Sequence, residues 1–75
     1  MNNCLKEKRL AKGYSQAELA KKSNVSRQTI IDIENGSLKW LRSDTMLKLA
    51  IALDCDVSTI FFDDFVMQTQ QQKVV

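Results

Sequence analysis

The sequence predicts an all-α fold of five short helices, and three of its features support this prediction. Its 75 residues contain no proline and only two glycines, which favours helices over a loop-rich or all-β fold. The hydrophobic content of 44% suits one small globular core. Apolar residues recur at helical spacing, in stretches that capping residues separate. We therefore expect one compact domain over residues 1–62 and a C-terminal tail over 63–75.

The first helix is expected over about residues 3–12, with Leu5 and Leu10 facing the core. Gly13 ends this helix, because glycine readily adopts the left-handed conformation at a helix C-terminus. Tyr14 precedes the next helix and is expected to pack inward as a hydrophobic staple.

Two further helices, over about 16–23 and 27–35, form the most informative segment of the chain. Each follows a serine, a good N-cap residue, and Glu18 lies three residues after Ser15, which is the spacing of a capping box. Asn24 lies where the chain must turn and tolerates a left-handed backbone. Two short helices joined by a tight turn are the typical layout of a protein that reads the major groove of DNA.

A linker and two more helices complete the predicted domain. The fourth helix begins near Ser43 and Asp44 and runs to Leu53, and Asp56 caps a short fifth helix. The expected core consists of Leu5, Leu10, Leu19, Ala20, Val25, Ile30, Ile33, Leu49, Ala50, Leu53, Val57 and Ile60. The apolar side of the fourth helix is also expected to include Met46 and Leu47.

The chain resembles the Cro/CI-type (XRE-family) helix-turn-helix domain of phage repressors and bacterial regulators, over roughly residues 3 to 62. The matching residues are Arg9, Gly13, Ser15, Gln16, Glu18, Leu19, Ala20, Val25–Ile30, Ile33–Gly36, Leu47, Leu49, Ala50, Ala52, Leu53, Val57, Ile60 and Phe61. The resemblance implies a lambda-repressor-like domain that binds double-stranded DNA as a transcriptional regulator. It most simply implies a phage-type or mobile-element repressor that reads a palindromic operator.

By this resemblance, Arg27, Gln28 and Asp32 match the principal base-contacting positions. Arginine pairs well with guanine, glutamine with adenine, and a carboxylate accepts from cytosine. Asp32 alternatively orients Arg27 or Gln28. Thr29 and Ile31 are further candidates, for contact with a thymine methyl group.

Contacts with DNA phosphates are expected from Gln16, Asn35, Lys39 and Arg42. Gln16 opens a helix whose first backbone N–H groups favour an anion. In the family this glutamine also braces the first residues of the recognition helix.

The resemblance also implies a salt bridge between Arg9 and Glu34 that ties the recognition helix to the first helix. Trp40 departs from the family's usual basic linker, and we expect it to pack across the fourth helix rather than intercalate.

The charge distribution is asymmetric along the chain. Residues 1–50 carry ten Lys/Arg and five Asp/Glu, a net charge of +5, whereas 51–75 carry one and four, a net charge of −3. A basic part and an acidic part suit a protein that faces a polyanion with one side. Chance clustering on a solvated surface is the alternative interpretation.

The C-terminal apolar residues predict a homodimer, because they carry more apolar surface than the end of a five-helix domain can bury. The residues expected in this two-fold contact are Phe61, Phe62, Phe65, Val66 and Met67. The alternative is that Phe61 completes the core. Two further functions stay open: an antitoxin or antirepressor-type module whose tail binds a protein partner, and a restriction–modification controller.

Composition argues against several other classes of protein. With no histidine, no glycine-rich phosphate loop and no cysteine pair motif, the sequence predicts neither an enzyme nor a metal or cofactor site. Cys4 and Cys55 are expected to be free thiols. No membrane span or secretory signal is evident, so we expect a cytoplasmic, nucleoid-associated protein of a bacterial or phage-infected cell.

Overall fold

The computed structural model describes residues 3–61, and within them the chain forms helices and no β-strand. The helices are α1 (Leu5–Ala11), α2 (Gln16–Ser23), α3 (Arg27–Asn35), α4 (Ser43–Ala52) and α5 (Val57–Ile60). This arrangement confirms the all-α prediction, and each helix begins within two residues of its predicted start.

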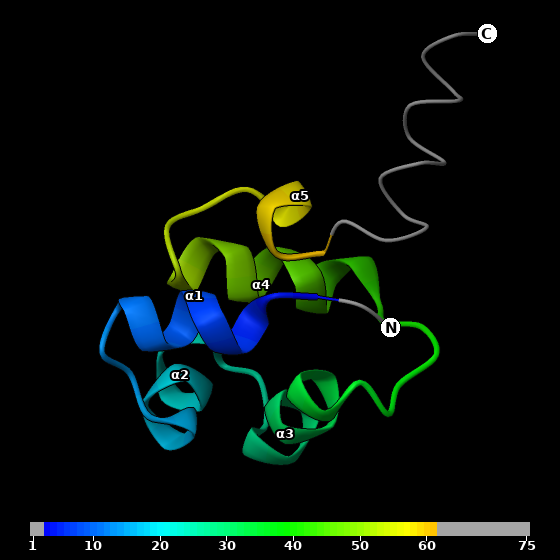
Figure 1. The fold of residues 1–75 in the computed structure, drawn as a ribbon, viewed down its shortest axis with the longest axis horizontal. Coiled ribbons are helices and arrows are strands. Elements are labelled where there is room, and N and C mark those ends of the chain that lie inside the picture. Colours follow the sequence, from blue (N-terminus) through cyan, green and yellow to red (C-terminus); the bar gives the residue numbers. More distant parts are fainter. Residues whose placement is uncertain (1–2, 62–75) are drawn as a thin grey trace, which may run out of the picture.

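The helices pack at mixed angles around a single core. α2 packs against α3 and α4, α1 packs against α3, and α5 packs against α4. In Figure 1, α2 and α3 lie on one side of α1 and α4, and α5 lies on the other side. The helix pair that resembles a DNA reader, α2 and α3, therefore packs on one side against α1 and α4.

The core contains most of the residues that the sequence predicts. Its buried side chains are Leu5, Leu19, Val25, Ile30, Ile33, Met46, Leu49, Ala50, Leu53, Ile60 and Phe61. Ala20 and Val57, both predicted to lie in the core, are half-buried at its edge, as is Tyr14. Met46 and Phe61 are buried in addition to the predicted core, and Met46 lies on the side of α4 that the sequence predicts to be apolar.

Two predicted inward-facing leucines lie at the surface instead. Leu10 is 57% exposed and Leu47 is 53% exposed. In α1 the inward positions one turn apart are Leu5 and Arg9, so Leu10 points to a different side of the helix. In α4 the inward side is formed by Met46, Leu49 and Ala50, which leaves Leu47 facing outward.

The two ends of the described chain are joined by hydrogen bonds near the start of α1. The backbone N–H of Cys4 donates to the carbonyl of Ile60 at 2.9 Å, and its Sγ donates to the carbonyl of Thr59 at 2.9 Å. This contact holds α5 against α1 and brings Phe61 into the core. Cys4 and Cys55 are both free, and burial raises the pKa of the Cys55 thiol.

Across residues 3–61, every helix is too short or too polar to cross a membrane.

Candidate nucleic-acid interface

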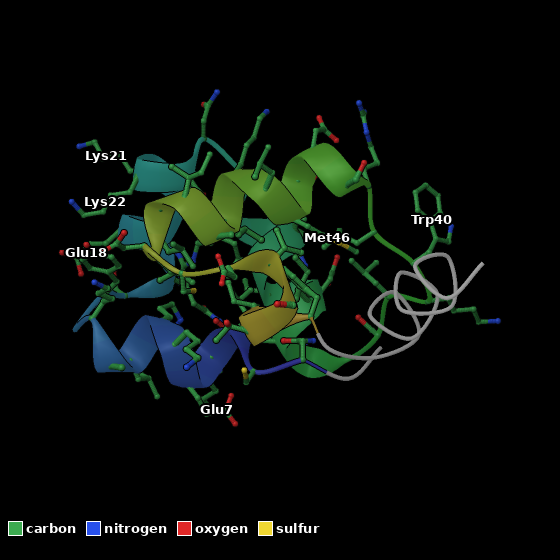
Figure 2. All side chains as sticks on the ribbon, turned by 90° about the horizontal axis from the view of Figure 1, so that it is seen from above. Glu7, Glu18, Lys21, Lys22, Trp40 and Met46 are labelled. Carbon is green, nitrogen blue, oxygen red and sulfur yellow. The ribbon has the colours of Figure 1, made fainter. Side chains whose placement is uncertain are left out.

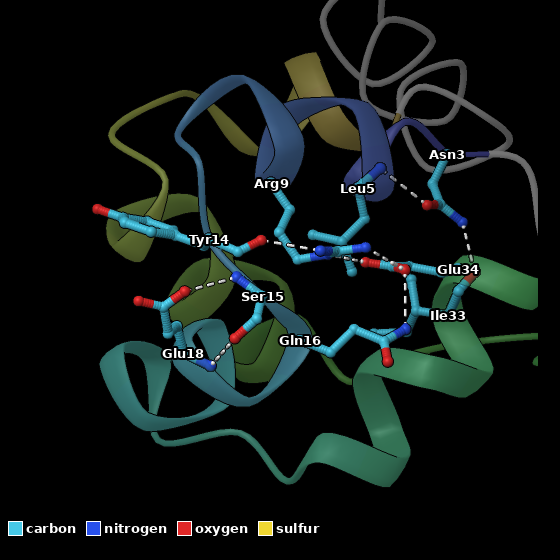
Figure 3. A network of polar contacts seen from close by, with 9 residues as sticks. All are labelled: Asn3, Leu5, Arg9, Tyr14, Ser15, Gln16, Glu18, Ile33 and Glu34. Atoms are coloured by element: carbon cyan, nitrogen blue, oxygen red, sulfur yellow. Dashed lines mark hydrogen bonds and ion pairs between the residues drawn. The ribbon is translucent and has the colours of Figure 1, made fainter.

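A reciprocal capping box fixes the start of α2. The backbone N–H of Glu18 donates to Ser15 Oγ at 3.0 Å, and the backbone N–H of Ser15 donates to Glu18 Oε1 at 2.8 Å (Figure 3). The hydrogen bond from the Ser15 backbone N–H stabilises the charged carboxylate, so the pKa of Glu18 lies below its usual range. The capping box predicted from sequence is therefore confirmed.

A tight turn and a second cap fix the start of α3. Asn24 ends α2 in the left-handed conformation, with φ of 59°. Ser26 Oγ then accepts a hydrogen bond from the backbone N–H of Thr29 at 3.1 Å, which satisfies a donor of the first turn. Arg27 and Gln28 thereby become the first two residues of the helix.

A buried carboxylate near the end of α3 connects it to both helices that precede it. Arg9 Nε donates to Glu34 Oε2 at 2.7 Å, and Arg9 Nη2 donates to Glu34 Oε1 at 3.1 Å. Gln16 Nε2 also donates to Glu34 Oε1 at 3.1 Å (Figure 3). The Arg9 and Glu34 side chains are only 8% and 5% exposed, and their hydrogen bond raises the pKa of Arg9. The salt bridge expected from the resemblance is present, whereas Gln16 braces the end of α3 rather than its first residues.

A second connection to the end of α3 was not predicted from the sequence. Asn3 Nδ2 donates to the carbonyl of Ile33 at 2.9 Å, while Asn3 Oδ1 accepts from the backbone N–H of Leu5 at 3.0 Å (Figure 3). One asparagine thus joins the start of α1 to the last turn of α3. Its sequence signal is weak, because an asparagine before a helix ordinarily indicates only a cap.

The first turn of α3 presents its polar side chains to solvent. Arg27 and Gln28 are exposed, and Arg27 forms no ion pair within residues 3–61. Gln28 Nε2 donates to Asp32 Oδ1 at 3.0 Å, across one turn of the helix. Thr29 and Ile31, the other predicted base-reading candidates, lie between these two residues in sequence and are half-buried.

The four predicted phosphate-contacting residues lie at the start of α2, at the end of α3 and in the linker that follows it, and they differ in exposure. Gln16 is half-buried, while Asn35, Lys39 and Arg42 are exposed. Arg42 Nε lies 3.1 Å from Asp44 Oδ1 in an ion pair whose side chains are 72% and 52% exposed.

The linker between α3 and α4 borders a groove that sequence reasoning missed. The groove has a volume of about 630 Å³ and is lined by linker residues 37–42, Thr29 of α3 and Thr45 of α4. Trp40 does not pack across α4 as predicted, because Leu38 and Leu41 are the linker residues that pack against the core. The indole is 71% exposed and projects away from the helices (Figure 2).

The predicted dimer contact requires one correction. Phe61 is 1% exposed and completes the core, so its ring is not presented to a second copy of the chain. The other residues of that prediction, Phe62, Phe65, Val66 and Met67, lie outside the described residues.

Comparison with known proteins agrees with this geometry. A family model for helix-turn-helix domains, HTH_3, matches residues 5–60, which span all five helices. No curated protein matches the chain. The match to the helix-turn-helix family model covers well over half of the sequence and includes the capped helices α2 and α3. The chain therefore belongs to the XRE-type (Cro/CI-like) helix-turn-helix family and is a DNA-binding transcription regulator.

Proposed function

We propose that this regulator is a sequence-specific repressor of the phage or mobile-element type, which binds a palindromic operator as a homodimer. The observation that carries the proposal is the construction of α3. Its first turn exposes Arg27 and Gln28, while buried Glu34 near its other end is held by Arg9 and Gln16. A rigidly held helix with polar side chains on its exposed N-terminal turn suits entry into the major groove.

In this proposal Arg27 and Gln28 read bases directly. Arg27 pairs with guanine O6 and N7, and Gln28 pairs with adenine N6 and N7. Asp32 acts as a positioning residue. A carboxylate only accepts hydrogen bonds, so Asp32 must face the amide nitrogen of Gln28, and this fixes the orientation of the Gln28 amide group. The free Nε2 hydrogen and Oε1 of Gln28 then have the donor and acceptor pattern that adenine requires. Thr29 and Ile31 contribute apolar contacts with a neighbouring thymine methyl group.

Phosphate contacts position the helix without reading sequence. The first backbone N–H groups of α2, at Gln16 and Ala17, have no carbonyl acceptor within their own helix and favour an anion. Asn35, Lys39 and Arg42 lie along the exposed end of α3 and the linker, where they extend the same contact. Binding should therefore weaken steeply as salt is raised.

A dimer is proposed because one domain of this size contacts too few base pairs for useful specificity. The tail residues Phe62, Phe65, Val66 and Met67 are the proposed two-fold contact. Sedimentation should show a dimer at tens of micromolar or on operator DNA. A monomer under both conditions would contradict this part of the proposal.

Selection of bound sites from random duplex DNA tests the proposal as a whole. We expect a palindromic consensus, tight binding at low salt and repression of a reporter promoter that carries the site. Binding without base preference would contradict direct readout. A salt-insensitive affinity would contradict the phosphate contacts. A stable complex with a protein partner through the tail, together with weak DNA binding, would instead favour the antitoxin or antirepressor function.

A further inference from the structure

Trp40 is the most exposed large hydrophobic side chain in the described part of the molecule. Its indole is 71% exposed, although Leu38 and Leu41 on either side of it pack against the core. These half-buried leucines take the inward positions of the linker, which leaves Trp40 facing outward. An indole held in solvent leaves a large apolar surface and an N–H donor available for a ligand.

The groove beside Trp40 is continuous with the proposed DNA-reading surface. Thr29, which lines the groove, is in the first turn of α3 directly after Gln28. Ser37, on the linker side of the groove, donates through its Oγ to the carbonyl of Asp32 at 3.1 Å. A strand that enters the groove would therefore lie next to the bases that α3 is proposed to read.

The charge and polarity of the groove fit a sugar–phosphate strand. Linker residues 37–42 contain Lys39 and Arg42 and no acidic residue. Arg42 forms an ion pair with Asp44, and this pair is largely exposed, so exchanging it for a phosphate costs little. The hydroxyl-bearing residues Thr29, Ser37 and Thr45 line the same groove. Cations, hydroxyls and an apolar ring together match the alternating phosphates and deoxyriboses of a DNA backbone.

We infer that this groove holds the DNA backbone strand bordering the major groove, with Trp40 packed against a deoxyribose and its Nε1–H donating to a phosphate. The inference rests on the proposed function, because α3 must occupy the adjacent major groove. It makes Trp40 a sequence-independent affinity contact, distinct from the base-reading role proposed for Arg27 and Gln28.

The chain contains one tryptophan, so its fluorescence reports this contact without a label. Acrylamide quenching of the full chain is measured alone, with a selected operator duplex and with a duplex of scrambled sequence. We expect the operator to reduce the quenching constant several-fold and to shift the emission to shorter wavelength. Labelled-operator anisotropy, measured in parallel, reports binding independently of Trp40.

Affinity of a Trp40→Ala variant gives a second readout. Loss of the indole contact should weaken binding to operator and scrambled DNA by a similar factor, about three- to tenfold. Leu10→Ala is the matched control, since Leu10 is 57% exposed on α1 and does not line the groove. It should leave both affinities unchanged.

Several results would overturn the inference. One is normal operator binding by anisotropy while Trp40 remains as accessible to acrylamide as in the free protein. Another is a Trp40→Ala variant that changes base preference, since a backbone contact carries none. Protection of Trp40 by raised protein concentration without DNA would identify a protein contact instead. Absence of any selected site is a different outcome, which contradicts the proposed function itself.

Discussion

Glu34 accepts three hydrogen bonds from side chains of α1 and α2, two from Arg9 and one from Gln16. Both members of the ion pair are nearly inaccessible to solvent. In that environment each charge depends on the other, because an unpaired buried charge has lost its hydration without compensation. The position of α3 therefore depends strongly on one carboxylate that makes no proposed contact with DNA.

Glu34→Gln should destabilise the domain severely, because it leaves the Arg9 guanidinium buried without a counter-charge. The expected loss in free energy of unfolding is about 3–5 kcal/mol. Urea denaturation of the variant and the parent measures it. Asp44→Asn is the matched control, since it breaks the exposed pair with Arg42 and should cost at most about 1 kcal/mol. Equal losses for the two variants would show that burial of the Arg9 pair has no special effect.

Asp32→Ala separates a positioning role from a base-reading role. If Asp32 fixes the Gln28 amide, its removal weakens discrimination at the same base position that Gln28→Ala affects. The Gln28→Ala variant should lose about 1–3 kcal/mol of discrimination there, and Asp32→Ala part of it. Competition binding with single-base variants of the operator measures both. An Asp32 effect confined to a different base position would mean that Asp32 reads its own base.

At the scale of elements, local signals predicted the helix starts well and the inward faces less well. Ser15 with Glu18 and Ser26 with Thr29 form caps through neighbours three residues away, so a short stretch of sequence contains the whole interaction. The inward face of a short helix depends on what packs against it. Leu10 was therefore wrongly placed in the core, since Arg9 takes the inward position to reach Glu34.

The exposure of Trp40 in the linker and the burial of Phe61, the last described residue, also could not be predicted from local sequence. Trp40 and Phe61 are both large aromatic residues near the edge of the domain, and hydrophobicity alone does not distinguish them. Phe61 is buried because Cys4 holds α5 against α1, a contact between residues far apart in sequence. Trp40 is exposed because Leu38 and Leu41 take the inward positions of the linker. The roles of the residues proposed to contact DNA were predicted from the family resemblance, because the local sequence pattern alone does not identify them.

The capping box of α2 should make stability sensitive to acid. Its hydrogen bonds lower the folded-state pKa of Glu18 below the ordinary value of 4.5, so the ionised form stabilises the fold. This contribution is present above that value and is lost as the pH falls through the lower, folded-state pKa. The Glu18→Gln side chain still accepts from the Ser15 N–H but does not titrate. The stability of this variant should therefore fall less than that of the parent between neutral pH and about pH 3. Thermal melts of both proteins across this pH range measure the loss of stability, and equal losses in variant and parent would contradict this prediction.

At the scale of the whole molecule, the fold places the proposed reading helices and the two aspartates that precede α5 on opposite sides. α2 and α3 lie on one side of α1 and α4, while α5, preceded by Asp54 and Asp56, lies on the other (Figure 1). α2 and α3 together are electrically neutral, so the net charge of +5 for residues 1–50 comes from α1 with Lys12 and from the linker residues Lys39 and Arg42. Any electrostatic steering toward DNA would therefore come from the linker beside α3 rather than from the reading helices themselves.

The most direct test of sequence reading by the first turn of α3 is site selection with variants. Parent, Arg27→Ala and Gln28→Ala are each taken through selection from random duplex DNA, with Leu10→Ala as a surface control. The account predicts a palindromic consensus for the parent and the control. It also predicts that each α3 variant loses preference at one defined pair of symmetric positions, guanine for Arg27 and adenine for Gln28. Consensus sequences that are the same for parent, Arg27→Ala and Gln28→Ala, or the absence of any consensus, would contradict it.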